Sequence, residues 1–309
     1  MGTVVQFMHP GRQPDVTAAG RQEWNAGTHR RSFLSVRGAS TKSLSAAKIS
    51  SSILGVWAEW EAPALAVPTG SSIAPYAFEP EMPLFPSRPG LQNTDPFIFD
   101  GPFLYSNCRQ VRKNGHPTKL QELGAGDVVV FGSHMNGSFV LDTVFVVADS
   151  IPYEPATGES KLGTRVPPSF LHATMRPLAG VRRPSAHVAK TVLDPCGPEQ
   201  CSEEDETAAC GPPCAESNAA RFRLYWGATP SAPIDGMFSF APAKTMAETI
   251  VPFQRPALDM PFISAGLSQN WRACPAEAQP AWRAIAERVL EQGLELGVSF
   301  EIVPSKRSF

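Results

Sequence analysis

The run from residue 123 to residue 147, LGAGDVVVFGSHMNGSFVLDTVFVV, constrains the fold more than any other part of the chain. Asn136-Gly137 divides it into two apolar halves. Asn-Gly between two apolar runs is the strongest short-range signal for a β-hairpin, because both residues tolerate positive φ. We therefore predict that residues 127–133 and 139–149 pair as antiparallel strands.

The second half of this run alternates in character. A period of two predicts that Leu141, Thr143, Phe145 and Val147 share one face of the strand. Asp142 then points to the opposite face, where it needs either solvent or a partner.

The rest of the chain also indicates strands more than helices. Residues 3–8, 53–61, 221–227, 236–243 and 297–303 have strand-like patterns. The clearest helix is PAWRAIAERVLEQG, residues 280–293, with apolar side chains at helical spacing and Gly293 placed to end it. Residues 12–50 are polar and are expected to be mostly irregular, and the proline-rich residues 62–96 are expected to form a long surface loop.

Composition limits the class of protein. The chain has 309 residues, 31 of them proline and 24 glycine, which predicts many loops and interrupted strands. We expect an α+β protein, with residues 1–309 forming a single elaborated domain. Its strands are predicted to form a twisted, partly closed β-barrel with peripheral helices and long loops.

Charge and hydropathy limit the partners. The net charge of -2 gives no global attraction to nucleic acid, so any nucleic-acid site must be a local patch. The first residues lack the pattern of a signal peptide, and no apolar stretch reaches membrane-spanning length. We expect a cytoplasmic protein, in which the six cysteines are thiols or metal ligands rather than disulfides.

The segment LQELGAGDVVVFGSHMNGSFVLDTVFVV resembles the central hairpin of the PUA-like superfamily, which includes the ASCH, EVE and YTH domains. With YSNCRQ before it, GDVVVFGS also resembles the nucleotide-modification-associated domains found beside base-modification genes. The resemblance covers residues 97–149. It implies a PUA-like barrel that recognises a base or modified nucleotide in DNA or RNA, within a modification or defence system.

The strand GVWAEWEA offers the first candidate site. Alternation places Trp57, Glu59 and Glu61 on one face, so that an aromatic surface lies beside two carboxylates. A base can stack on the ring, and a carboxylate can accept hydrogen bonds from the base edge. The alternative is that this face lies in solvent, with Trp57 half covered by the following loop.

The basic loop at residues 109–119 offers a second candidate site. It carries Arg109, Arg112, Lys113, His116 and Lys119, and elsewhere in the sequence Arg30 and Arg31 stand near His29. The arginine and lysine side chains would contact phosphates. The alternative is an ordinary solvated face. In the hairpin that follows, three polar residues are candidates for lining a ligand pocket: Ser133, His134 and Asp142.

Residues 194–220 read as a surface insertion rich in cysteine, proline and acidic residues. Its four cysteines, Cys196, Cys201, Cys210 and Cys214, would suit a structural zinc ion, which prefers four thiolates. Their spacing is not the usual C-x2-C pair, and a flexible loop that carries cysteines is the alternative.

Three classes of function remain. The leading hypothesis is a module that binds a base or nucleotide. The second is an enzyme acting on nucleotides or nucleic acid, with a catalytic residue among Cys108, His134, Asp142 and the two glutamates 59 and 61; the base for Cys108 would be His116 or His134. The third is a protein-interaction scaffold. No dinucleotide-binding glycine motif, P-loop, zinc-protease motif or nucleophile elbow occurs in the sequence.

Overall fold

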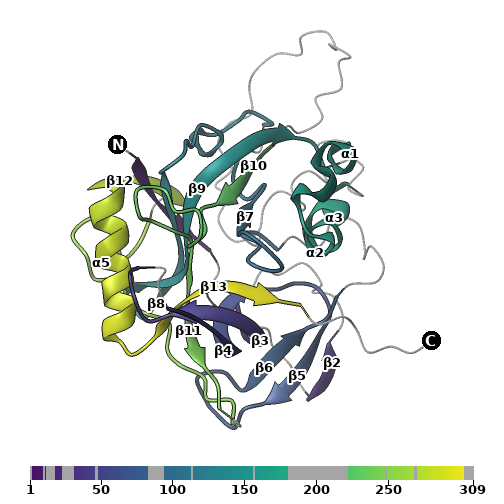
Figure 1. Cartoon of the computed structure of the whole chain (residues 1–309), viewed down its shortest axis with the longest axis vertical. Coiled ribbons are helices and arrows are strands. Elements are labelled where there is room, and N and C mark those ends of the chain that lie inside the picture. Colours follow the sequence, from purple (N-terminus) through teal and green to yellow (C-terminus); the bar gives the residue numbers. More distant parts are fainter. Residues whose placement is uncertain are drawn as a thin grey trace, which may run out of the picture.

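The computed structural model describes residues 2–9, 11, 18–22, 31–45, 48–82, 94–112, 114–155, 157–179, 222–247, 249–267 and 270–302. In this part of the chain, strands dominate and form two mixed sheets, with short helices at the periphery (Figure 1). The expected α+β, strand-rich class is confirmed. The closure of the strands into a PUA-like barrel stays a prediction.

The first sheet has the strand order β12-β1-β8-β9-β10-β7. Within it, β1 and β8 run parallel, and the other neighbours run antiparallel. Its strands are β1 (Thr3–Met8), β7 (Leu104–Tyr105), β8 (Val128–Met135), β9 (Ser138–Tyr153), β10 (Phe222–Gly227) and β12 (Trp271–Glu277).

The second sheet has the strand order β13-β11-β4-β3-β6-β5-β2. Because β13 pairs with β3 as well as with β11, the strands β3, β4, β11 and β13 are connected in a ring. The strands of this sheet are β2 (Gly20–Gln22), β3 (Arg31–Thr41), β4 (Ile49–Glu59), β5 (Ala64–Pro68), β6 (Tyr76–Pro80), β11 (Ala241–Thr245) and β13 (Glu295–Glu301).

Helical segments lie on two sides of the sheets (Figure 1). The helix α5 (Ala278–Glu291) packs on β1, β12 and β13 and buries Trp282, Ile285 and Val289, as its apolar stripe predicts. The other helical segments are η1 (Lys119–Gln121), α1 (Gly158–Leu162), η2 (Gly163–Arg165), α2 (Pro168–Phe170), the π-helical η3 (Leu171–Met175) and α3 (Arg176–Ala179).

The predicted hairpin is confirmed as β8 and β9. Asn136 and Gly137 form its two-residue turn with φ of 51° and 82°, so that Met135 pairs with Ser138. The predicted alternation fails at one point, because the register skips Asp142: Phe131 pairs with Thr143, and Gly132 pairs with Leu141. This β-bulge moves Leu141 away from the face that Phe145 and Val147 share and reorients Asp142.

Several strands were not expected. The strand β3 lies within residues 12–50, and β5 and β6 lie within the predicted loop at 62–96. Residues 236–243 were predicted to form one strand, but only the end of this range belongs to β11. Phe240, just before β11, forms an isolated bridge with Val144.

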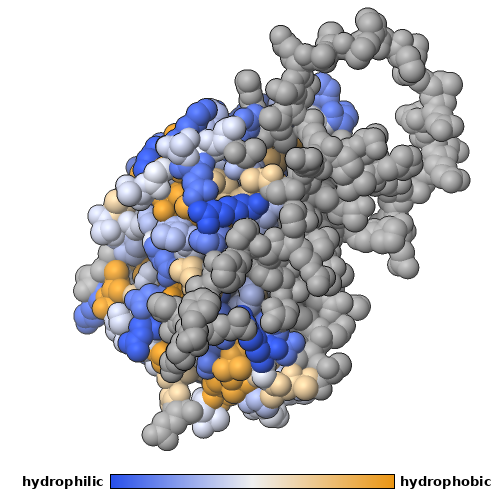
Figure 2. All heavy atoms as spheres, turned by 90° about the vertical axis from the view of Figure 1, so that its right-hand side faces the viewer, coloured by the Kyte–Doolittle hydropathy of each residue, from blue (hydrophilic) through white to orange (hydrophobic). Residues whose placement is uncertain are grey.

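The exterior is mixed in character. Figure 2 shows one face on which scattered apolar patches lie between polar and charged side chains. Among the described residues, the exposed large apolar side chains are Ile49, Ile53, Leu65, Ile73 and Val251. Such scattered apolar groups are ordinary for a protein exterior.

Candidate functional site

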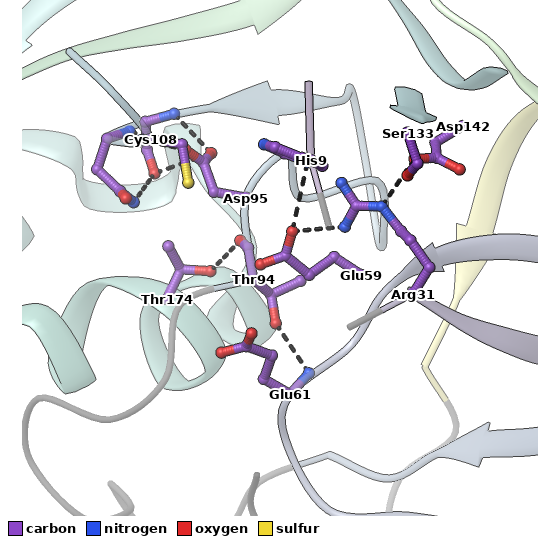
Figure 3. A network of polar contacts seen from close by, with 12 residues as sticks. His9, Arg31, Glu59, Glu61, Thr94, Asp95, Cys108, Ser133, Asp142 and Thr174 are labelled. Atoms are coloured by element: carbon purple, nitrogen blue, oxygen red, sulfur yellow. Dashed lines mark hydrogen bonds and ion pairs between the residues drawn. The ribbon is translucent and has the colours of Figure 1, made fainter. Parts of the chain in front are cut away.

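A cluster of polar and charged side chains is buried where the first sheet meets β3 and β4 (Figure 3). Each of its six residues is at most 7% exposed. We call this cluster the polar centre, and it consists of His9, Arg31, Glu59, Ser133, Asp142 and Arg255. Buried charges are rare in proteins unless they are paired, so a cluster of this size requires a structural or functional reason.

Asp142 is the acceptor that joins two arginines of the polar centre. Arg31 Nε donates to Asp142 Oδ2 at 2.9 Å, and Arg255 Nη1 donates to Asp142 Oδ1 at 2.9 Å. Ser133 Oγ donates to Asp142 Oδ2 at 3.1 Å. The sequence prediction that Asp142 needs a partner is therefore met by two cations, which the bulge in β9 allows it to reach.

Glu59 lies between Arg31 and His9 (Figure 3). Arg31 and Glu59 are cross-strand partners in the β3–β4 ladder, and Arg31 Nη1 donates to Glu59 Oε2 at 2.5 Å. The same oxygen lies 3.6 Å from His9 Nδ1. Burial alone would lower the pKa of Arg31, but the charges of Glu59 and Asp142, and hydrogen bonds to both, outweigh this and raise it above its ordinary value. Arg31 is therefore a permanent cation.

His9 is the residue whose polar atoms are least satisfied. Its ring packs against Phe7 and Phe131, with centroid distances of 4.7 and 5.3 Å. Within the described residues, neither ring nitrogen of His9 has a hydrogen-bond partner, and neither does Arg31 Nη2. Most buried polar groups in folded proteins have such a partner, so these atoms mark a place where a ligand or an ordered water would bind.

Five separate parts of the chain build the polar centre, and one of them is the β8–β9 hairpin, which contributes Ser133 and Asp142. His9 follows the end of β1, Arg31 begins β3, and Glu59 ends β4. Arg255 comes from an extended segment that runs beside β9, where Leu141 N donates to Pro256 O and Leu258 N donates to Phe139 O. Strand ends and a bulge thus bring together side chains that are far apart in sequence.

Trp57 does not offer the stacking surface that its strand suggests. It is 6% exposed, it contacts Phe33 edge to face, and its indole N–H donates to Phe253 O at 2.8 Å. The alternation itself is correct, because Val56 and Trp57 lie in different core clusters. The alternative of a solvent-exposed face is wrong, because Glu59 and Glu61 are also buried. The sheet is covered on both sides here, so alternation does not separate core from solvent.

A second group of polar residues extends from the polar centre toward η3 (Figure 3). The backbone N–H of Glu61 donates to Thr94 Oγ1, and Thr174 Oγ1 donates to Thr94 O. Asp95 accepts hydrogen bonds from the backbone N–H groups of residues 106, 107 and 108 at 2.7 to 2.9 Å. Burial raises the pKa of Asp95 to about 6, although these hydrogen bonds oppose the shift.

Cys108 is poorly placed for nucleophilic catalysis. Burial, followed by the charges of Asp95 and Glu59, raises the pKa of its thiol well above the ordinary value. A cysteine acts as a nucleophile through its thiolate, so this environment disfavours that role. Its two expected bases, His116 and His134, are both exposed, while Cys108 packs against the core.

The other residues of the basic loop have different environments. Arg109 is half-buried, and Asn270, with its amide oxygen turned toward the guanidinium, accepts from Arg109 Nη2 at 2.6 Å. The loop residues Arg112, His116 and Lys119 are exposed, which agrees with the alternative that this loop is an ordinary solvated face. Lys113 lies outside the described residues. In the hairpin, Ser133 belongs to the polar centre, whereas the His134 ring is exposed and lies 2.7 Å from Ala265 O.

The predicted zinc ligands, Cys196, Cys201, Cys210 and Cys214, lie outside the described residues. Among the residues that are described, no group of three or more histidine, cysteine, aspartate or glutamate side chains is arranged to hold a metal ion. No helix in the same part of the chain has the length and apolar character needed to cross a membrane.

Sequence reasoning missed His9 and Arg255. His9 stands in His9-Pro10-Gly11, which signals only the end of a strand, and Arg255 stands in a proline-containing segment without periodicity. Neither position carries a local signal of burial. Comparison with known proteins adds no assignment, because no family model, curated protein or solved structure matches the chain.

Proposed function

We propose that the protein is a binding module for a base or nucleotide of DNA or RNA, and that the polar centre contacts the ligand. The resemblance of residues 97–149 to base-reading PUA-like domains supports the ligand class, and the hairpin it rests on is present as β8 and β9. A partly closed barrel, a cytoplasmic location and a role in nucleic-acid modification or defence belong to the same proposal.

The observation that carries this proposal is that the buried His9 imidazole lacks hydrogen bonds from the described residues. The His9 imidazole is 7% exposed, and neither nitrogen has a hydrogen bond from the described residues; Glu59 approaches Nδ1 only to 3.6 Å. Such a missing hydrogen bond costs about 1–3 kcal/mol for each unsatisfied group. A ligand that hydrogen-bonds to His9 and to Arg31 Nη2 would recover this free energy on binding.

The test is a titration with short DNA and RNA oligonucleotides, modified and unmodified, at two salt concentrations. We compare wild type with His9→Phe, which keeps a ring packed against Phe7 and Phe131 but removes both nitrogens. His172→Phe is the matched control, because it changes a half-buried histidine of η3 that pairs with Arg176.

We expect wild type and His172→Phe to bind alike, and His9→Phe to bind at least tenfold more weakly. Because residues of the exposed basic loop would contact phosphates, binding should be weaker at the higher salt concentration. Equal binding by His9→Phe would remove the polar centre from the ligand site. If no oligonucleotide binds to wild type, the proposed ligand class is wrong.

One observation favours an enzyme as the second candidate. His9 Nδ1 lies 3.6 Å from the Glu59 carboxylate, an arrangement that would hold Nδ1 protonated and leave Nε2 free to accept a proton from water or a hydroxyl group. Mass spectrometry of nucleotides incubated with wild type and with His9→Phe tests this candidate. A new product from wild type alone would establish catalysis. If the nucleotides stay unchanged, the binding module remains the proposed function.

A further inference from the structure

We infer that the polar centre selects bases that carry a lactam edge, in which a ring N–H stands beside a carbonyl oxygen. Guanine, hypoxanthine, uracil and thymine have this edge, whereas adenine and cytosine do not. The inference rests on the proposed function and deepens it, because it names the chemical group that the site reads.

The donor half of the recognition comes from Arg31. Its Nη2 is buried and has no hydrogen bond within the described residues, while Nε and Nη1 are held by Asp142 and Glu59. A guanidinium donates hydrogen bonds and accepts none, so the group that binds to Nη2 must be an acceptor. The two ion pairs fix the plane of the guanidinium and therefore the direction in which Nη2 donates.

The acceptor half comes from the Glu59 carboxylate. It is the immediate neighbour of the Arg31 guanidinium and of the His9 imidazole, at 2.5 and 3.6 Å respectively. An ionised carboxylate has two oxygens with about four lone-pair sites between them, so the group can accept a further N–H in addition to its protein partners. A donor and an acceptor side by side match a lactam, whose carbonyl accepts from Arg31 and whose ring N–H donates to Glu59.

The charge of the polar centre favours a neutral group over a phosphate. Arg31 and Arg255 are paired with Glu59 and Asp142, so two cationic side chains stand against two carboxylates. Two more buried carboxyl groups, Glu61 and Asp95, lie toward η3 (Figure 3). An added anion would be buried without a matching cation, which is costly, whereas a neutral base edge is not.

Aromatic rings fix the position of His9. The His9 ring packs against both Phe7 and Phe131, which also contact each other at a centroid distance of 5.0 Å. The ring of His9 is thereby held in place beside Glu59, so its nitrogens are available at a fixed position. This is the kind of preorganisation that discrimination between base edges needs.

The experiment compares ligands that differ only at the lactam, with wild-type protein throughout. Short oligonucleotides, as DNA and as RNA, carry one variable base that is either hypoxanthine or 1-methylhypoxanthine, or either uracil or 3-methyluracil. Methylation replaces the ring N–H and keeps the carbonyl oxygen and the ring. Loss of one matched edge pair should weaken binding about 5- to 150-fold.

Equal affinity for the methylated and unmethylated bases overturns the lactam inference, while leaving the proposed binding function standing. Failure of wild type to bind any of the oligonucleotides contradicts the proposed function itself. An ordered water that satisfies His9 and Arg31 permanently would give this last result.

A protein variant provides an independent check. Glu59→Gln keeps the shape of the side chain but replaces an acceptor-only group by an amide that also donates. We expect the variant to lose most of its discrimination against 1-methylhypoxanthine, whereas discrimination as strong as that of wild type would remove Glu59 from the recognition. If the variant does not fold, the ligand comparison with wild type still decides the inference.

Discussion

The free energy of unfolding should depend far more strongly on Asp142 than on Asp149, although both are ion-paired aspartates of β9. Asp142 is 1% exposed and accepts from Arg31, Arg255 and Ser133. Asp142→Ala leaves two buried guanidinium groups short of an acceptor, and removing one partner of a buried ion pair costs about 3–5 kcal/mol.

Asp149 provides the matched control. It pairs with Arg165 at 2.7 Å, but the side chains are 59% and 47% exposed respectively. An exposed pair of this kind contributes about 0–1 kcal/mol, because water and salt screen it. Asp149→Ala should therefore change stability little, and 1 M salt should remove most of that change.

The assay is urea unfolding followed by tryptophan fluorescence, with the midpoint compared at unchanged slope. A large shift for Asp142→Ala and a small one for Asp149→Ala are expected. Similar shifts for the two variants would refute the reasoning, because the polar centre would then be no more desolvated than a surface pair.

Three further predictions concern the core and the titratable groups. Phe145→Ala should cost about 3–5 kcal/mol in urea unfolding, because its ring is fully buried; a loss below 1 kcal/mol would contradict its packing. Asp95 has a pKa of about 6 in the folded protein against an ordinary 3.8, so the folded state retains a proton that the unfolded chain has released. The protonated Asp95 should therefore stabilise the folded state below pH 4, and this contribution, up to about 3 kcal/mol, should be lost as the pH rises through 6. Between these pH values, the free energy of unfolding should fall less steeply with pH in Asp95→Asn than in wild type. Cys108 should react with iodoacetamide at pH 7 more slowly than a free thiol, as measured peptide by peptide in the folded protein. Labelling at the rate of an unstructured cysteine would contradict the raised pKa of its thiol.

Local patterns in the sequence account for the hairpin and for α5. Asn136-Gly137 sets the turn, and the apolar stripe of residues 280–293 sets the buried face of the helix. These signals depend only on residues near one another in the chain, so they need no knowledge of the rest of the fold.

The strand β3 shows where local patterns fail. Its sequence, RSFLSVRGAST, is rich in serine and other small residues, and it forms because β4, β6 and β13 all pair with it. Its Gly38 lies so close to Ser299 O that a side chain there would clash. Small residues that look irregular in sequence are therefore required by close packing between strands.

The candidate site was predicted only in part. Glu59, Ser133 and Asp142 were named from the sequence as ligand-site candidates, and Arg31 as a phosphate-binding candidate. The structure brings them together with His9 and Arg255, and it pairs Arg31 with two buried carboxylates. The β-bulge that reorients Asp142 and the strand ends that deliver His9 and Arg31 depend on register between distant segments. The same register buries Trp57, which removes the stacking surface that alternation alone suggests.

The most direct test of the central claim is an NMR titration that observes the imidazole nitrogens of the six histidines while a uracil-containing oligonucleotide is added. Assignment follows from the missing signals of His9→Phe and His172→Phe. We predict that the His9 resonances shift with the same saturation curve as binding, while those of His172 stay in place. Saturable binding that leaves the His9 resonances unchanged would contradict the claim that the polar centre contacts the ligand.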